Sequence, residues 1–110
     1  MTRKDLKLLV QNHLDELEYT HPFINSDKFL ENSFAKFACK KILEEIDIAE
    51  TLPFDLTPIE ILEAFRDKMD RYASMNQKNS ISFSIMSDTA QYLIERFWVQ
   101  TWKHSKRNHF

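Results

Sequence analysis

Four residues near the N-terminus have the types and spacing of metal ligands. His13 and Glu16 form the pattern H-x-x-E, and Glu18 and His21 form E-x-x-H. The second pattern is the ligand spacing of dimetal carboxylate sites in four-helix bundles, which also need a second E-x-x-H and glutamates from other helices. No second E-x-x-H occurs in the chain. We therefore expect no metal site, and we interpret His13 as a histidine at the edge of the core that bonds to Glu16 or to a neighbouring helix.

The only cysteine, Cys39, is the other candidate for chemistry. A catalytic thiol needs a base and an electropositive surrounding site, and the sequence displays neither around this position. We predict that Cys39 is a small buried hydrophobic residue. A single cysteine forms no internal disulfide, and the N-terminus has no apolar leader, so we expect a reducing, cytoplasmic setting.

The chain contains no glycine. Phosphate-binding loops of the Walker and G-x-G-x-x-G types depend on glycine, as does the G-x-S-x-G turn of hydrolases. These routes to nucleotide chemistry and to acyl transfer are therefore excluded, and we expect no cofactor.

Length and hydrophobic periodicity predict an all-α protein. The 110 residues, 43% of them hydrophobic, suffice for one domain spanning 1–110, and no apolar run is long enough to cross a membrane. Apolar residues recur at helical spacing in four segments. The predicted helices are 3–19, 27–49, 58–75 and 88–103. We expect a compact four-helix bundle-like domain with a long ordered loop before the last helix.

Local signals define the helix ends and the expected core. Thr2 with Asp5 and Thr57 with Glu60 are predicted N-terminal caps, and Asn76 is predicted to end the third helix in the left-handed conformation. The second helix is apolar around most of its circumference, which predicts a central position. The residues expected to be mostly buried are Phe37, Ile42, Phe65, Leu93 and Phe97.

The segment 76–86 is polar except for Ile81, Phe83 and Ile85, which alternate with serines. A period of two predicts an extended segment with one apolar side. We favour an irregular loop that tucks these side chains against the bundle over a strand that pairs in a dimer.

Two charged regions are candidate binding surfaces. Glu60, Glu63, Asp67 and Asp70 share one face of the third helix, which we interpret as a solvated face with pairs such as Arg66–Asp70 and Asp67–Arg71. The alternative is a docking surface for a basic protein. Arg96, Lys103, Lys106 and Arg107 form a basic C-terminal patch, interpreted as a frayed tail near the helix dipole. Nucleic-acid binding is the alternative, which a net charge of −2 makes unlikely.

The aromatic content favours a role in protein–protein contact. The chain has nine Phe, three Tyr and two Trp residues, more than a small core requires. The predicted interface consists of Ile81, Phe83, Ile85, Trp98 and Trp102. Its expected partner is an unidentified protein helix or a second copy of the chain, as in a homodimer. Nucleic-acid binding is the second hypothesis and an enzyme with an unrecognised site the third.

Overall fold

The computed structural model describes the backbone of residues 2–20 and 26–108 and the side chains of 2–20 and 28–102. These described residues form four α-helices and one short 3₁₀-helix. The elements are α1 (Arg3–Thr20), α2 (Ser26–Ala49), α3 (Pro58–Met75), η2 (Gln77–Asn79) and α4 (Ser80–Asn108). The all-α, four-helix prediction is confirmed. The third helix has the predicted bounds, and the first two differ from prediction by one residue.

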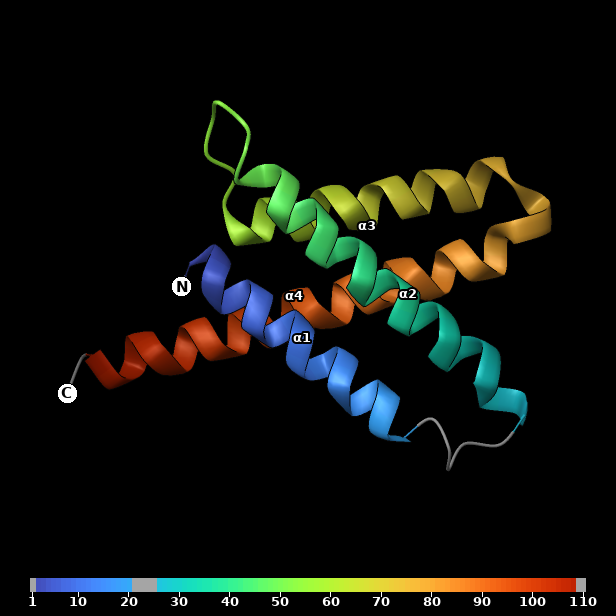
Figure 1. Ribbon diagram of the computed structural model, residues 1–110, viewed down its shortest axis with the longest axis horizontal. Helices are drawn as coiled ribbons and strands as arrows, with labels where there is room; N and C mark the ends of the chain where they lie inside the picture. The colour runs from blue at the N-terminus through green and yellow to red at the C-terminus, as the bar shows by residue number, and fades with distance from the viewer. Residues whose placement is uncertain (1, 21–25, 109–110) are drawn as a thin grey trace.

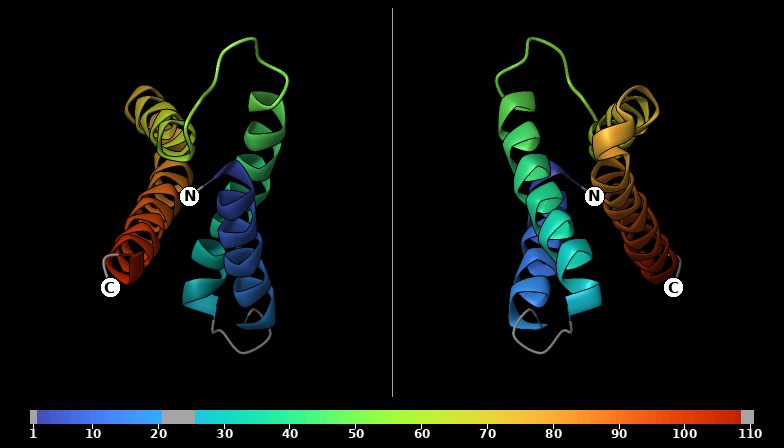
Figure 2. Two further views of the ribbon diagram at one scale, coloured as in Figure 1. Left: turned by 90° about the vertical axis from the view of Figure 1, so that its left-hand side faces the viewer. Right: turned by 90° about the vertical axis from the view of Figure 1, so that its right-hand side faces the viewer.

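The helices form two antiparallel pairs, α1 with α2 and α3 with α4, which lie in two layers that diverge (Figures 1 and 2). The most extensive packing is between α3 and α4, and α4 also contacts α1 and α2. The molecule measures 47 × 34 × 21 Å with a radius of gyration of 14.9 Å, above the value of about 13 Å expected for a compact chain of this length. The C-terminal end of α4 projects beyond the other helices (Figure 1).

The predicted N-terminal caps are confirmed. The backbone N–H of Thr2 donates to the Asp5 carboxylate at 2.7 Å, and the Asp5 N–H donates to the Thr2 hydroxyl at 3.2 Å. Thr57 and Glu60 exchange the same two bonds, at 3.1 and 3.2 Å, with Pro58 at the start of α3. These bonds satisfy N–H groups that have no partner inside the helix.

One apolar core joins all four helices. The buried side chains come from α1 (Leu6, Val10), α2 (Ile42, Ile46), α3 (Leu62, Phe65) and α4 (Leu93, Phe97), among others. The predicted burial of Ile42, Phe65, Leu93 and Phe97 is confirmed, since none exposes more than 4% of its surface.

The predicted central position of α2 is wrong. Phe37 is 47% exposed, and Leu30 and Ile48 on the same side of α2 are also about half exposed. The Lys41 ammonium lies 5.4 Å from the centre of the Phe37 ring. A cation, rather than another helix, therefore covers part of this ring. The best-connected helix is α4, not α2.

The predicted long loop before the last helix is also wrong, because α4 begins at Ser80 rather than at Ser87 or Asp88. Helical geometry turns Phe83 toward α3, where its ring lies 5.3 Å from that of Tyr72. The Ser87 hydroxyl donates to the Asp70 carboxylate one turn further on. Contacts with α3 therefore override the weak helix preference of the serine-rich segment.

Asn76 does not adopt the predicted left-handed conformation. Its dihedral angles are φ −133° and ψ 89°, and its side chain accepts a hydrogen bond from the Asn79 N–H at 3.3 Å. Asn76 thus caps the start of η2, and the chain turns from α3 into α4 through this single 3₁₀ turn.

The two sides of α2 allow a matched test of the core. We expect Ile42→Ala to lower the free energy of unfolding by about 2–5 kcal/mol through cavity formation. Phe37→Ala should lower it by only about 1 kcal/mol, because the ring is half exposed and loses mainly its contact with Lys41. Urea denaturation followed by circular dichroism measures both. Equal losses for the two variants would show that the outer side of α2 is covered.

Burial of Cys39 predicts an unreactive thiol. The side chain is fully buried, and this burial raises the pKa of the thiol to about 12. A disulfide reagent such as dithiobis(nitrobenzoate) should therefore leave the folded protein unmodified and react fully in urea. Because the folded state holds the proton more tightly, the free energy of unfolding should fall as pH rises above 9, and this component should vanish in Cys39→Ala. Rapid labelling of the folded protein would contradict the prediction.

Candidate protein interface on helix α4

A row of side chains along α4 faces away from the core, at spacings that alternate between four and three residues. The row, which we call the outer stripe, consists of Ile81, Ile85, Asp88, Tyr92, Glu95, Val99 and Trp102. All are exposed except Ile85, which is half-buried. Residues at this spacing lie on one side of a helix and form the contact seam of coiled coils. The outer stripe therefore has the geometry against which a second helix packs.

The segment once expected to be a loop contributes to two faces of α4. Ile81 and Ile85 belong to the outer stripe, and Ile81 is 68% exposed. Phe83 faces the other way and packs against the core and Tyr72. The residues of the predicted interface therefore do not share one face, because Phe83 takes part in the internal packing of α3 and α4.

Trp98 and Trp102 lie near the projecting end of α4. They are 55% and 60% exposed, and Val99 between them is 45% exposed. Ile81 and Trp102 are separated by twenty-one positions of one helix, a distance of about 31 Å. These two members of the predicted interface thus lie at opposite ends of one face of the helix.

A recess opens where α1, α2 and α4 meet beside the middle of the outer stripe. Its volume is about 510 Å³, and it is lined by His13, Leu17, Glu31, Ala35, Ile85, Asp88, Thr89 and Tyr92. The lining combines apolar side chains with two carboxylates, Glu31 from α2 and Asp88 from α4. It includes no lysine or arginine, so the recess has a negative potential.

His13 stands in the wall of this recess. Its ring lies 4.7 Å from that of Tyr92, and its side chain is 17% exposed. The Nδ1 atom lies 3.6 Å from the Glu16 carboxylate, too far for the hydrogen bond that the sequence predicts, and has no other hydrogen-bond partner among the described residues. The ring contact of His13 is therefore with Tyr92 on α4, at a tilt of 36°.

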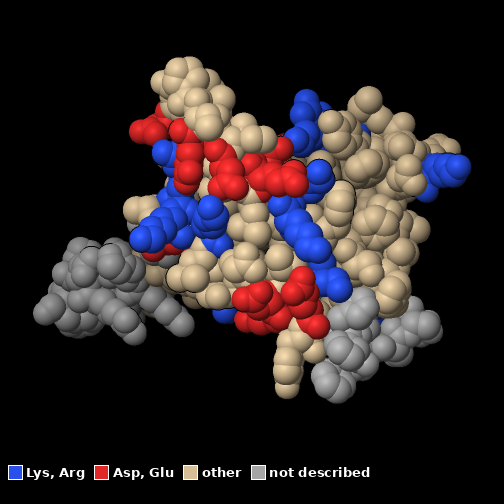
Figure 3. Space-filling model, viewed as in Figure 1, with Lys and Arg blue, Asp and Glu red and all other residues tan. Residues whose placement is uncertain are grey.

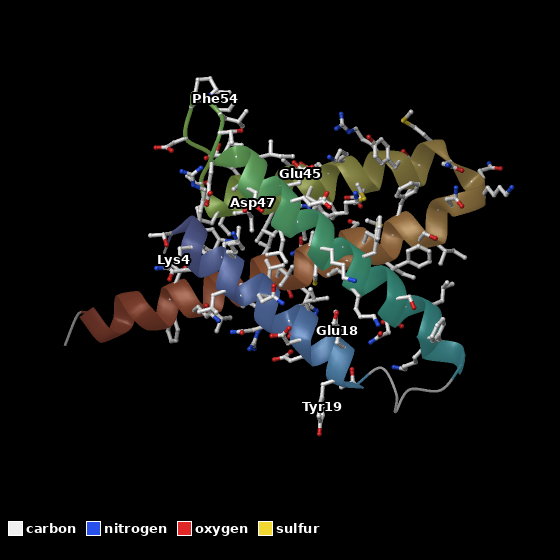
Figure 4. The ribbon with its side chains drawn as sticks, in the orientation of Figure 1. Lys4, Glu18, Tyr19, Glu45, Asp47 and Phe54 are labelled. Carbon is white, nitrogen blue, oxygen red and sulfur yellow. The ribbon has the colours of Figure 1, made fainter. Side chains whose placement is uncertain are left out.

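The metal-like motif does not assemble into a ligand set in the described part of the chain. Glu18 lies on the exposed side of α1 (Figure 4), and His21 is outside the described residues. No group of three or more His, Cys, Asp or Glu side chains within residues 2–20 and 28–102 is arranged to hold a metal ion.

Three of the four acidic residues that the sequence analysis interprets as a solvated face, with a docking surface as the alternative, make separate local contacts. Glu60 belongs to the cap of α3, where the Thr57 N–H lowers the pKa of its carboxyl group below the ordinary value. Asp67 pairs with Arg66 at 3.1 Å, and Asp70 accepts the Ser87 hydroxyl. Glu63 is half-buried. The predicted pairs Arg66–Asp70 and Asp67–Arg71 are replaced by these contacts.

Basic side chains neutralise the acidic residues at the end of α2. The contacts are Arg3–Asp55 at 3.4 Å, Lys7–Asp47 at 3.0 Å, Lys41–Glu44 at 3.3 Å and Lys68–Glu45 at 3.2 Å. Acidic and basic atoms accordingly lie next to one another over this part of the surface (Figure 3). Such exposed pairs add little stability, but they cancel the field that would attract a basic partner.

The predicted basic patch continues the projecting end of α4. Arg96 is exposed and lines a small cavity of about 90 Å³ with Glu16 and Gln100. Lys103, Lys106 and Arg107 lie within the helical backbone, which reaches Asn108 rather than fraying as predicted, and their side chains are outside the described residues.

Sequence reasoning missed most of the outer stripe and the recess. The residues that the sequence did not indicate as part of an interface are Glu31, Asp88, Tyr92, Glu95 and Val99. Those on α4 follow Ile81 at spacings that alternate between four and three. The spacing indicates one helix face only if the helix is known to begin at Ser80.

Comparison with known proteins gives no functional information. No family model matches the chain, and no curated protein or solved structure is significantly similar to it. Within the described residues, no helix is long and apolar enough to span a membrane.

Proposed function

We propose that this protein acts by protein–protein contact, as a non-catalytic adaptor, inhibitor or regulator in the cytoplasm, and that the outer stripe of α4 is its binding face. The observation that carries the proposal is the exposed row from Tyr92 through Val99 to Trp102 on a helix that projects from the bundle. Helix faces with this spacing bind partner helices in coiled coils and helix-in-groove complexes.

The exposure at the end of α4 supports this choice of surface. Phe97 is the last buried residue among the described side chains, so α4 continues beyond the core. Trp98 and Trp102 follow within the next two turns, and tryptophan is enriched among the residues that dominate binding energy at interfaces. Exposed apolar side chains on a projecting helix end gain from being covered by a partner.

Nucleic-acid binding through the last helix and the basic patch is the second candidate. The exposed Arg96 and the continuous helix through the sequence of Lys103, Lys106 and Arg107 favour it. Asp88 and Glu95 oppose it, because both carboxylates lie on the outer stripe and would face the phosphates. A catalytic function ranks third, since the raised pKa of Cys39 disfavours a thiolate nucleophile at neutral pH.

Two substitutions on the outer stripe test the proposed function. We expect Trp102→Ala and Val99→Ser to weaken recovery of a partner from native lysate at least about tenfold, as for central interface residues. Ile48→Ser is the matched control, because Ile48 is an equally exposed aliphatic residue on α2. Pull-down with quantitative mass spectrometry measures recovery, and thermal melts confirm that each variant is folded.

The same experiment separates the alternatives. Nuclease treatment of the lysate should leave recovery unchanged, and loss of the partner on treatment would favour nucleic-acid binding. Sedimentation velocity of the purified protein reports whether a second copy occupies the face. Two outcomes would refute the outer stripe as the binding face. In the first, the amount of partner recovered falls only as far as the folded fraction of each variant falls. In the second, Ile48→Ser lowers partner recovery as much as the substitutions on the outer stripe do.

A further inference from the structure

We propose that the partner of the outer stripe is a basic amphipathic helix, with one of its lysine or arginine side chains entering the recess between α1, α2 and α4. This inference rests on the proposed function and adds the chemistry of the partner. It is carried by the recess next to Asp88 and by the pattern of charge along α4.

The recess matches a long cationic side chain in both shape and composition. Leu17, Ala35 and Ile85 offer apolar surface to the methylene stem of such a side chain. Glu31 and Asp88 approach from two different helices and offer carboxylates to its charged end. Neither carboxylate has an ion pair with another described residue, in contrast to those at the end of α2.

Tyr92 adds an aromatic face to the same recess. Its ring is held against His13 at 4.7 Å and remains 41% exposed. A cation close to the face of an aromatic ring is attracted by the ring's quadrupole. The recess therefore presents the two groups, carboxylate and aromatic ring, that bind a guanidinium or ammonium group.

The neighbouring half of α1 makes the potential more negative. Asp15, Glu16 and Glu18 occur between Leu8 and Thr20, and this stretch contains no lysine or arginine. It also forms the C-terminal end of α1, where the helix dipole is negative and no basic residue occupies the last turn. His13 and Leu17 of this helix line the recess, so a cation entering there approaches the acidic end of α1, where Arg96 of α4 lies beside Glu16 in the adjoining cavity.

The middle of the outer stripe, from Asp88 to Val99, repeats its chemistry every seven residues. Asp88 and Glu95 are one heptad apart, and so are Tyr92 and Val99. A partner helix packed along this middle part would meet carboxylates at the first heptad position and apolar side chains at the second, while Ile81 and Trp102 make the first position apolar at the two ends of the stripe. The complementary partner thus carries Lys or Arg at one such position and apolar residues at the next.

This charge pattern argues against a second copy of the chain as the occupant. A two-fold pairing of two outer stripes would place Asp88 and Glu95 of both copies in one seam. Like charges in a partly desolvated seam oppose association, whereas basic side chains would pair with them. The observed stripe therefore selects a basic helix over its own copy.

The test uses two labelled helical peptides of three heptads, both with leucine at one seam position. The first has lysine at the other seam position, and the second has glutamate there. Fluorescence anisotropy with the full-length protein measures the affinity of each peptide at low and moderate salt. We expect the lysine peptide to bind at least about tenfold more tightly, with an advantage that shrinks as salt increases.

Charge-removing variants locate the binding. Asp88→Asn and Glu31→Gln should each weaken the lysine peptide about fivefold, whereas Asp67→Asn on α3 removes the same charge elsewhere and should change its affinity less than about twofold. Chemical shift changes of the Tyr92 and His13 rings on titration should report occupation of the recess, and thermal melts check folding.

The outcomes separate this inference from the proposed function. Equal binding of both peptides that depends on Val99 would overturn the basic partner and retain the outer stripe as an interface. An equal effect of Asp67→Asn and Asp88→Asn would overturn the recess. Absence of binding by the lysine peptide, or self-association of the protein abolished by Val99→Ser, would also overturn the inference. The Trp102→Ala pull-down independently decides the proposed function.

Discussion

The structure depends on a mismatch in length between two packed helices. Helix α4 has 29 residues and its main partner α3 has 18, which correspond to about 44 and 27 Å. Its inner face builds the core up to Phe97, and four of the five described side chains beyond this point are exposed. An isolated helical segment as short as the part of α4 after Phe97 has only marginal stability in water. An exposed helix end with two tryptophans is thus a segment that a binding partner would stabilise.

Charge compensation distinguishes the surfaces that the protein uses internally from the one that it leaves open. Arg3 and Lys7 of α1 reach the end of α2, where Arg3 also donates to the Ala49 carbonyl at 3.0 Å. These contacts anchor the first turn of α1 and cancel the local acidic charge. At the other end of α1, the acidic residues have no such basic counterpart in their own helix. The carboxylates of Glu31 and Asp88 in the recess likewise have no ion pair with another described residue.

Local features were predictable from the sequence because they depend on neighbouring residues. The Thr57–Glu60 cap requires only the two residues and the proline between them, and it forms as expected. The start of α4 was not predictable in this way. Ile81, Phe83 and Ile85 alternate with serines, which fits a strand period, yet the same residues also divide between two faces of a helix. Only contacts with distant residues, Phe83 with Tyr72 and Ser87 with Asp70, decide between the two.

The exposure of Phe37 shows a second limit of periodicity. An apolar residue on every side of α2 predicts contact on every side, but the pattern does not reveal how many helices are available to supply it. Phe54 at the tip of the α2–α3 connection and Tyr19 at the end of α1 likewise point away from the bundle (Figure 4). The pattern of apolar and polar residues identifies which side chains can be buried. The arrangement of the helices determines which of these side chains are buried.

The histidine that first suggested a metal site has a different part in this structure. His13 comes from α1, packs its ring at a tilt of 36° against that of Tyr92 of α4, and so joins the two layers at the edge of the recess. This contact restricts the Tyr92 ring while leaving 41% of the residue exposed. An aromatic side chain that is already ordered loses less conformational entropy when a partner covers it. His13 of the H-x-x-E motif therefore holds an aromatic residue of the outer stripe in place through ring packing.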